Sequence, residues 1–496
     1  MKSKRLTLSV LFVVAAVANA LACTNLIVGK NASADGSTIV SYSADSYGLF
    51  GELYHYPAGM HKKGTLIDIH EWDTGKYLGQ IAQARQTYNV IGNMNEFQLT
   101  IGETTFGGRP ELVDTTGIID YGSLIYLGLQ RSRTAREAIK VMTELVQEYG
   151  YYSGGESFTI ADPNEIWIME MIGKGPGVRG AVWVAVRVPD DCISAHANQS
   201  RIHQFNMNDK ENCMYSPDVI SFAREKGYFD GVNKDFSFAN AYAPLDFGAR
   251  RYCEARVWSY FNMFTDRGNE FLPYILGETN TPMPLFVKPN RKVSVQDVKN
   301  AMRDHYEGTP LDISKDFGAG PYHTPYRLSP LSFKVGDREY FNERPISTQQ
   351  SGFVFVAQMR SELPDPIGGV LWFGTDDANM TVFTPVYCCT DKVPVCYTRV
   401  DGADYITFSW NSAFWIFNWV ANMVYPRYDL MMGDVRATQT ELETTFNEAQ
   451  EGVEAAAAKL LEKDPAKAKA FLTNYTNMTA QSTFDTWNCL LYTSPS

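Results

Sequence analysis

Alternating and periodic hydrophobic positions divide the chain into strand-like and helix-like segments. Short alternating or apolar runs predict strands over residues 88–91, 98–102, 157–161, 165–171, 183–188, 192–197, 352–359 and 370–374. Helical spacing predicts a helix over residues 134–149, with Ala138, Val141, Met142 and Leu145 on one face. Because the strands come in runs with helices between them, we expect an α+β fold with mixed or antiparallel sheets.

The segment after residue 22 predicts a β-hairpin. Residues 23–29 and 38–44 have strand patterns, and the turn between them contains Asp35 and Gly36. A three-residue loop over residues 34–36 would place Asp45 on the same face as Cys23, as a diagonal neighbour. A two-residue Asp35-Gly36 loop would place Asp45 on the other face. The sequence leaves both registers open.

Two further segments concern the C-terminal part of the chain. Residues 405–426 carry no charge, but asparagines form a polar stripe beside the apolar positions, which favours a helix buried in protein over a membrane span. From Gly433 to about Asn474 the chain is rich in Ala, Glu, Lys and Leu, which predicts an amphipathic helical extension over residues 433–488. Residues 489–496 break this pattern and resemble read-through into a sequencing adapter, so we expect a non-native tail there.

The N-terminus has the pattern of an export signal. Basic residues within positions 2–5 precede an apolar run over residues 6–18, which is shorter than the ~20 residues of a membrane span. Ala20-Leu21-Ala22 supplies the small-x-small pattern of a signal-peptidase site. We therefore expect residues 1–22 to be a signal peptide, Cys23 to begin the mature chain, and the protein to be exported to the periplasm or the cell exterior.

Composition and charge narrow the classes of partner. The 496 residues are 45% hydrophobic and 13% aromatic, which supports a large packed core and excludes a wholly disordered chain. The formal net charge of −12 argues against nucleic acid or an anionic membrane surface as a main partner. The seven histidines show no metal-ligand spacing, and no glycine-rich phosphate loop precedes a helix. We expect neither a metal nor a cofactor, and a homo-oligomer is compatible with the sequence.

A cysteine directly after a signal peptide has two competing interpretations. In a bacterial lipoprotein the thiol is lipidated, but that class prefers a branched aliphatic residue where this chain has Ala20, and a flexible tether where it has a strand pattern. In an N-terminal nucleophile hydrolase the same cleavage creates a nucleophile and its base. We favour a catalytic Cys23 over a lipid-anchored, non-enzymatic surface protein. A papain-like Cys–His pair would not require the cysteine to lie at the cleavage site.

An N-terminal cysteine carries both groups that acyl transfer needs. An α-amine with a pKa of ~7.7–8.0 is a usable base near neutral pH, and a thiol with a pKa of ~8.5 is partly ionised there. The thiolate attacks an acyl carbon, the amine passes the thiol proton to the leaving group, and water then hydrolyses the thioester. Orienting and oxyanion-stabilising groups remain to be supplied by the rest of the chain.

Several segments in the same order resemble the cysteine-type dipeptidases of the dipeptidase A and secernin family. They are residues 23–30, 35–38, 95–96, 102–105, 161–165, 304–310 and 363–372. This resemblance implies an αββα N-terminal nucleophile hydrolase sandwich over residues 23–432, followed by the helical extension. It also implies that small dipeptides are the substrates, and that they are hydrolysed through a thioester acyl-enzyme.

The resemblance also implies roles for individual residues. Cys23 matches the nucleophile, Asp45 the acidic residue that binds its amine, and Asn198 the amide of the oxyanion hole. Arg256 resembles the distal active-site arginine, with Arg251 as the alternative.

Two further positions match the family less closely. Thr105 takes the approximate place of a second oxyanion donor. Tyr42 stands where related cysteine amidases usually have an arginine that supports the thiolate, so the chain departs from their pattern at this position. Those relatives supply the alternative function, an N-acyl amidase of the bile-salt hydrolase or penicillin acylase type, which would need an elongated apolar pocket.

Overall fold

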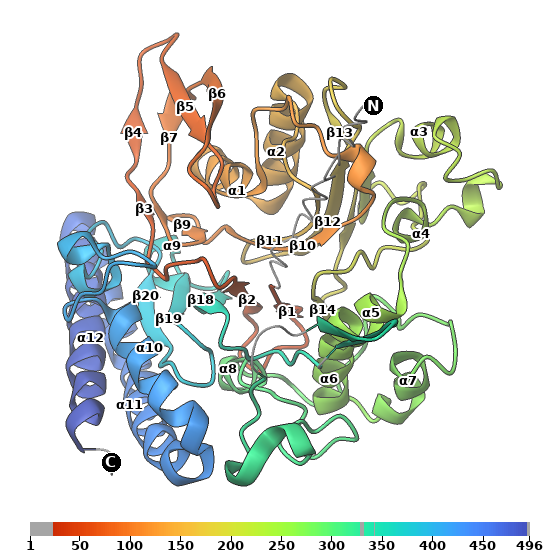
Figure 1. The fold of residues 1–496 in the computed structure, drawn as a ribbon. Helices are drawn as coiled ribbons and strands as arrows, with labels where there is room; N and C mark the ends of the chain where they lie inside the picture. Colours follow the sequence, from red (N-terminus) through yellow and green to blue (C-terminus); the bar gives the residue numbers. More distant parts are fainter. Residues whose placement is uncertain (1–22, 328–331, 342, 494–496) are drawn as a thin grey trace, which may run out of the picture.

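The computed structural model describes residues 23–327, 332–341 and 343–493 (Figure 1). The predicted signal peptide, residues 1–22, and the last three residues of the predicted non-native tail lie outside this part of the chain.

Two antiparallel sheets form the centre of the molecule. The first has the strand order β14-β1-β2-β18-β19-β20, and the second has the order β15-β13-β12-β11-β10-β9-β8-β3. The first sheet consists of β1 (Asn25–Val28), β2 (Thr38–Asp45), β14 (Ile193–His196), β18 (Ser351–Met359), β19 (Val370–Thr375) and β20 (Thr384–Tyr387). The second consists of β3 (His55–Tyr56), β8 (Val90–Ile91), β9 (Met94–Asn95), β10 (Thr100–Gly107), β11 (Gly155–Ala161), β12 (Ile166–Gly173), β13 (Ala181–Arg187) and β15 (Cys213–Tyr215).

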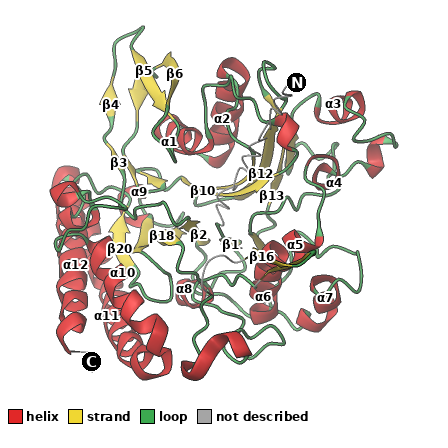
Figure 2. Ribbon diagram, viewed as in Figure 1, coloured by secondary structure: helices red, strands yellow, loops and turns green. Residues whose placement is uncertain are grey.

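The two sheets face each other, and helices cover their outer sides. Strands β1 and β2 contact β10 of the second sheet, and β2 also contacts β11. Helices α1 (Tyr121–Arg131) and α2 (Ala135–Tyr149) contact the second sheet, whereas other helices contact the first sheet (Figure 2). These are α6 (Ala255–Phe264), α8 (Val295–Ala301), α10 (Ala413–Val424), α11 (Tyr428–Leu461) and α12 (Pro465–Thr493).

Shorter elements lie outside these layers. Three two-stranded sheets pair β4 (Gly59–Met60) with β7 (Gln86–Thr87), β5 (Leu66–His70) with β6 (Tyr77–Ala82), and β16 (Ser332–Val335) with β17 (Arg338–Phe341). The remaining helices are α3 (Val219–Glu225), α4 (Phe238–Tyr242), α5 (Phe247–Ala249), α7 (Gly268–Ile275) and α9 (Asp365–Gly368).

The α+β interpretation of the hydrophobic pattern is confirmed. The predicted strands over residues 157–161, 165–171, 352–359 and 370–374 correspond to β11, β12, β18 and β19. The predicted helix over residues 134–149 is α2, which begins where the Thr134 side chain accepts a hydrogen bond from the Glu137 amide. Its buried face includes Ala138, Met142 and Leu145.

Neither predicted hairpin register is the observed one, although Asp45 lies on the face that the two-residue loop would give it. Ile27 pairs with Val40, and Thr24 forms a bridge with Ser43, so Asp45 belongs to the row of Thr24 and lies on the face opposite the Cys23 side chain. The reason is a longer connection, residues 29–37, which is held by contacts distant in sequence. The amide of Asn31 donates to the Asp190 carbonyl, and that of Ala34 donates to the Val293 carbonyl.

The C-terminal helices extend the first sheet on its β20 side. The uncharged segment contains α10, in which Phe414, Phe417, Ala421 and Val424 are buried, as the helical spacing predicts. Phe417 stacks on Trp487 of α12 at a centroid distance of 4.7 Å. None of the helices in the described part of the chain combines the length and apolar character that crossing a membrane requires.

Candidate active site

Cys23 lies just before β1, between the two sheets. Its side chain is 3% exposed, and its sulfur is 3.5 Å from Glu103 Oε1 and 3.8 Å from the Tyr42 hydroxyl. Burial raises the pKa of this thiol well above its usual value, and the nearby carboxylates of Glu103 and Asp45 raise it further. A hydrogen bond from the Asp45 backbone acts in the opposite direction and favours the thiolate.

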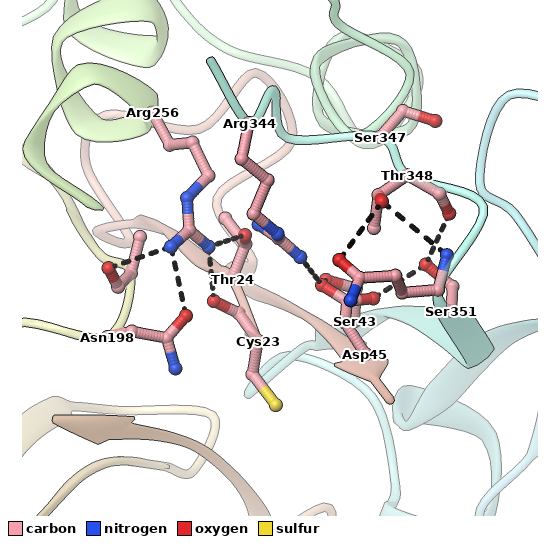
Figure 3. A network of polar contacts seen from close by, with 12 residues as sticks. Cys23, Thr24, Ser43, Asp45, Asn198, Arg256, Arg344, Ser347, Thr348 and Ser351 are labelled. Carbon is pink, nitrogen blue, oxygen red and sulfur yellow. Dashed lines mark hydrogen bonds and ion pairs between the residues drawn. The ribbon is translucent and has the colours of Figure 1, made fainter. Parts of the chain in front are cut away.

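On the side of Cys23 away from its sulfur lies a group of residues that we call the arginine cluster. It consists of the buried Thr24, Asp45, Arg256 and Arg344 and the half-buried Asn198. From α6, Arg256 Nη1 donates to the Cys23 carbonyl at 2.6 Å and to Thr24 Oγ1 at 2.8 Å. Its Nη2 donates to Asn198 Oδ1 at 2.9 Å and to the Ala197 carbonyl at 3.1 Å. Figure 3 shows the Cys23 sulfur pointing away from both guanidinium groups.

Within this cluster, Asp45 is held at the end of β2 by three partners. Its carboxylate forms an ion pair with Arg344 and accepts hydrogen bonds from Ser351 Oγ at 2.6 Å and Ser43 Oγ at 2.9 Å. Burial raises the pKa of Asp45, and the neighbouring Arg344 charge opposes that rise. Arg344 itself is 1% exposed, so both charges of the pair are buried.

Asn198 connects the arginine cluster to the second sheet. It follows β14 and adopts a left-handed backbone conformation, with φ 61°, which asparagine tolerates better than most residues. Its Nδ2 donates to the Thr105 carbonyl of β10 at 2.8 Å, while its Oδ1 accepts from Arg256. The amide is therefore held in one orientation at the edge of the site.

On the sulfur side of Cys23 lies a second group, which we call the acid cluster: Tyr42, Glu103, Thr105 and Glu156. Thr105 pairs with Glu156 across β10 and β11, which makes Glu103 a diagonal neighbour of Glu156 on the same face. The Tyr42 hydroxyl donates to Glu103 Oε1 at 2.7 Å, and Thr105 Oγ1 donates to Glu156 Oε1 at 2.9 Å.

The two glutamates form a coupled pair of buried carboxyl groups. Each is 1% exposed, and they hydrogen-bond each other. Burial raises the pKa of Glu103 to about 7, and burial together with the charge of Glu103 raises that of Glu156 well above its usual value. Because two adjacent carboxylates repel each other, the pair retains a proton near neutral pH.

The structure brings Cys23, Asp45, Asn198 and Arg256 together around one strand end. It separates Arg251 from them, because that side chain forms an ion pair with Glu343. The hydroxyl of Thr105 binds Glu156, and the carbonyl of the same residue binds Asn198.

His196 is a core residue and does not form a Cys–His pair with Cys23. Its two ring nitrogens contact the hydroxyls of Thr104 at 2.7 Å and Thr159 at 2.6 Å. Burial lowers its pKa to about 3, so the imidazole is neutral. The side chains within hydrogen-bonding reach of the Cys23 sulfur are those of Tyr42 and Glu103, and neither is a histidine.

Sequence reasoning missed Glu103, Glu156 and Arg344 as residues of the site. Glu103 lies inside one of the family-like segments, residues 102–105, and this was the available signal for it. Glu156 has no comparable signal, because its place beside Glu103 depends on the pairing of β10 with β11. Arg344 is 299 residues from Asp45, so no local pattern connects them.

Comparisons with known proteins identify the family of the chain. The model of peptidase family C69 matches residues 22–55 and 50–441. A "Probable dipeptidase" of Salmonella dublin is 30% identical over 395 residues, covering 74% of this chain and 81% of that protein. A "Probable dipeptidase" of Latilactobacillus sakei is 26% identical, with 91% and 90% covered, and "Dipeptidase A" of Lactobacillus helveticus is 24% identical, with 79% and 80% covered. The resemblance in the sequence motifs is thereby confirmed, and the chain belongs to peptidase family C69.

Proposed function

We propose that the protein is an exported dipeptidase whose nucleophile is the Cys23 thiol and whose base is the α-amine of the same residue. One observation carries the proposal: the residue that signal cleavage would place first in the mature chain lies at the centre of a buried polar network between two sheets. The names of the relatives supply the substrate class, since several are called dipeptidases.

The mechanism needs no second residue as a base. The α-amine of Cys23 takes the thiol proton, and the sulfur forms a bond to the scissile carbonyl carbon. As the carbon–nitrogen bond breaks, the new ammonium returns that proton to the departing amino acid. Water, deprotonated by the same amine, then hydrolyses the thioester and releases the first amino acid with regeneration of the thiol.

The arginine cluster would orient this leading residue. Arg256 holds the Cys23 carbonyl and so fixes the backbone that carries both the thiol and the amine. Asp45, at the adjacent strand end, is suited to bind the ammonium form of that amine, and the Arg344 charge favours its carboxylate form. Asn198, clamped by Arg256 and Thr105, is the proposed donor to the oxyanion.

The layers of the fold support this assignment. Helices α1 and α2, the two facing sheets, and helices α6 and α8 follow one another in the order αββα. We propose that residues 23–432 form an N-terminal nucleophile hydrolase sandwich and that residues 433–488 form its C-terminal extension.

The test compares mature protein, a form with one additional residue before Cys23, and the variant Cys23→Ala. We expect only the mature protein to cleave dipeptides, because the extension converts the amine into an amide and Cys23→Ala removes the nucleophile. Cys213→Ala is the matched control, a buried cysteine of β15 outside the site that should retain activity. An active extended form would overturn the mechanism.

Intact mass and a substrate panel separate the two alternatives. Mass spectrometry of the secreted protein should find an unmodified Cys23 as the first residue, whereas a lipid adduct there would indicate an anchored surface protein. Dipeptides should be cleaved faster than bile-salt conjugates or penicillin V, and the reverse order would indicate an N-acyl amidase.

A further inference from the structure

The acid cluster contains two buried carboxyl groups, and no cationic side chain among the described residues forms an ion pair with either of them. Buried carboxylates are normally paired with a cation or with several donors. Glu103 and Glu156 instead bond to each other, and apart from that mutual contact their Oε2 atoms have no hydrogen-bond partner in the described part of the chain. The donors that reach the Oε1 atoms are neutral or weak, namely the hydroxyls of Tyr42 and Thr105 and the thiol of Cys23.

A cavity reaches Glu156, one member of this pair. It has a volume of about 270 Å³, and Glu156 and Thr105 form part of its wall. Three further carboxyl groups line it, those of Glu71, Asp73 and Asp120. The cavity therefore offers a cation a route lined by carboxyl groups that reaches Glu156, the neighbour of Glu103.

The distances match the dimensions of a peptide substrate. The α-nitrogen of an amino acid is two bonds, or about 2.5 Å, from its carbonyl carbon. Glu103 Oε1 is 3.5 Å from the Cys23 sulfur that must contact that carbon. These lengths allow a dipeptide positioned for attack to place the amino group of its first residue within hydrogen-bonding distance of Glu103.

We propose that Glu103 and Glu156 bind the free α-ammonium group of the substrate, a proposal that rests on the dipeptidase function above. The ammonium supplies three donors and the positive charge that the acid cluster lacks. An N-acylated or des-amino substrate leaves the two carboxyl groups buried without that partner, so the site rejects it. Cleavage is thereby confined to the bond after the first residue of the substrate.

The experiment measures kcat/KM for alanyl-alanine and for propionyl-alanine, which has the same skeleton without the amino group. We expect wild-type protein to prefer alanyl-alanine by about 10²-fold or more, and Glu156→Gln to remove most of that preference by slowing only the substrate with the amino group. Glu144→Gln is the control, an exposed carboxyl group of α2 that does not line the cavity, and it should preserve the preference.

Other outcomes distinguish failure of the inference from failure of the proposed function. If wild-type protein cleaves alanyl-alanine and Glu156→Gln retains the full preference, the ammonium site is wrong and the dipeptidase remains. Equal slowing of both substrates in Glu156→Gln also overturns the site, because it indicates a general effect on the nucleophile. The rate of Cys23 alkylation by iodoacetamide checks that the variant is folded and reactive. No cleavage of any dipeptide by mature wild-type protein would overturn the proposed function itself.

Discussion

Two buried charged clusters lie on opposite sides of Cys23, and they differ in how completely they are paired. In the arginine cluster, the Arg344 charge meets the Asp45 carboxylate, and Arg256 donates to carbonyl, hydroxyl and amide oxygens. In the acid cluster, two carboxyl groups contact each other, a thiol and two hydroxyls, with no cation among the described side chains that bond to them.

This difference in pairing suggests different roles for the two clusters, positioning of the strand ends for the arginine cluster and ligand binding for the acid cluster. A charge that the fold neutralises costs free energy when its partner is removed, so the arginine cluster acts as a rigid support for the strand ends. A charge that the fold leaves without a counterion favours a ligand that supplies one. Cys23, the proposed nucleophile, thus lies between a side whose charges are paired within the chain and a side that we propose a substrate completes.

The largest expected effect comes from breaking the buried ion pair. Arg344→Met leaves the Asp45 carboxylate buried without its counter-charge, and we expect the free energy of unfolding to fall by about 3–5 kcal/mol. Denaturant unfolding measures this loss. The double variant Arg344→Met/Asp45→Asn removes both charges and should recover part of it, and equal stability of the two variants would contradict the role given to the pair.

Removal of the Asn198 side chain should mainly affect catalysis. Glycine suits the left-handed backbone at this position, so Asn198→Gly deletes the proposed oxyanion donor without adding backbone strain. We expect kcat for a dipeptide to fall by about 10²–10³-fold. The exposed Asn206→Gly is the control and should leave kcat unchanged; a similar kcat in the two variants would exclude Asn198 from the oxyanion hole.

The acid cluster should make stability depend on pH. The pKa of Glu103 is about 7 in the folded protein and near 4.5 when the group is unperturbed, so the folded state binds the proton more tightly. The free energy of unfolding should therefore fall as pH rises from about 5 to 7, by roughly 1–3 kcal/mol from this group. Thermal unfolding measured from about pH 5 to 7 should show that the stability of Glu103→Gln falls less steeply with pH than that of the wild-type protein. The same slope in both proteins would mean that Glu103 does not contribute to the pH dependence of stability.

An exposed ion pair on α2 gives the smallest expected effect and serves as a reference for the other variants. Lys140 and Glu144 lie one turn apart on α2, at a distance of 3.9 Å, and both are largely exposed. Replacing Glu144 by Gln should change the free energy of unfolding by no more than about 0.5 kcal/mol, because water and salt screen such pairs. A loss as large as that of Arg344→Met would show that burial does not account for the contrast between the pairs.

Local pattern was sufficient for much of the fold. The strands β11, β12, β18 and β19 and the helix α2 each carry their signal within a few residues, as alternation, helical spacing or a capping threonine. Cys23 was likewise identified from adjacent residues, since the cleavage pattern and the strand pattern lie on either side of it. The family motifs added Asp45, Asn198 and Arg256, which the structure gathers around Cys23.

The tertiary structure alone decided how these pieces meet. The face on which Asp45 lies depends on a nine-residue connection, residues 29–37, that is held by Asp190 and Val293, so turn chemistry by itself led to the wrong register. Arg344 reaches Asp45 across 299 residues, and Glu103 reaches the thiol only because the second sheet packs against the first. Sequence patterns report the preferences of neighbouring residues, whereas the charge balance around Cys23 arises from burial and from contacts between distant segments.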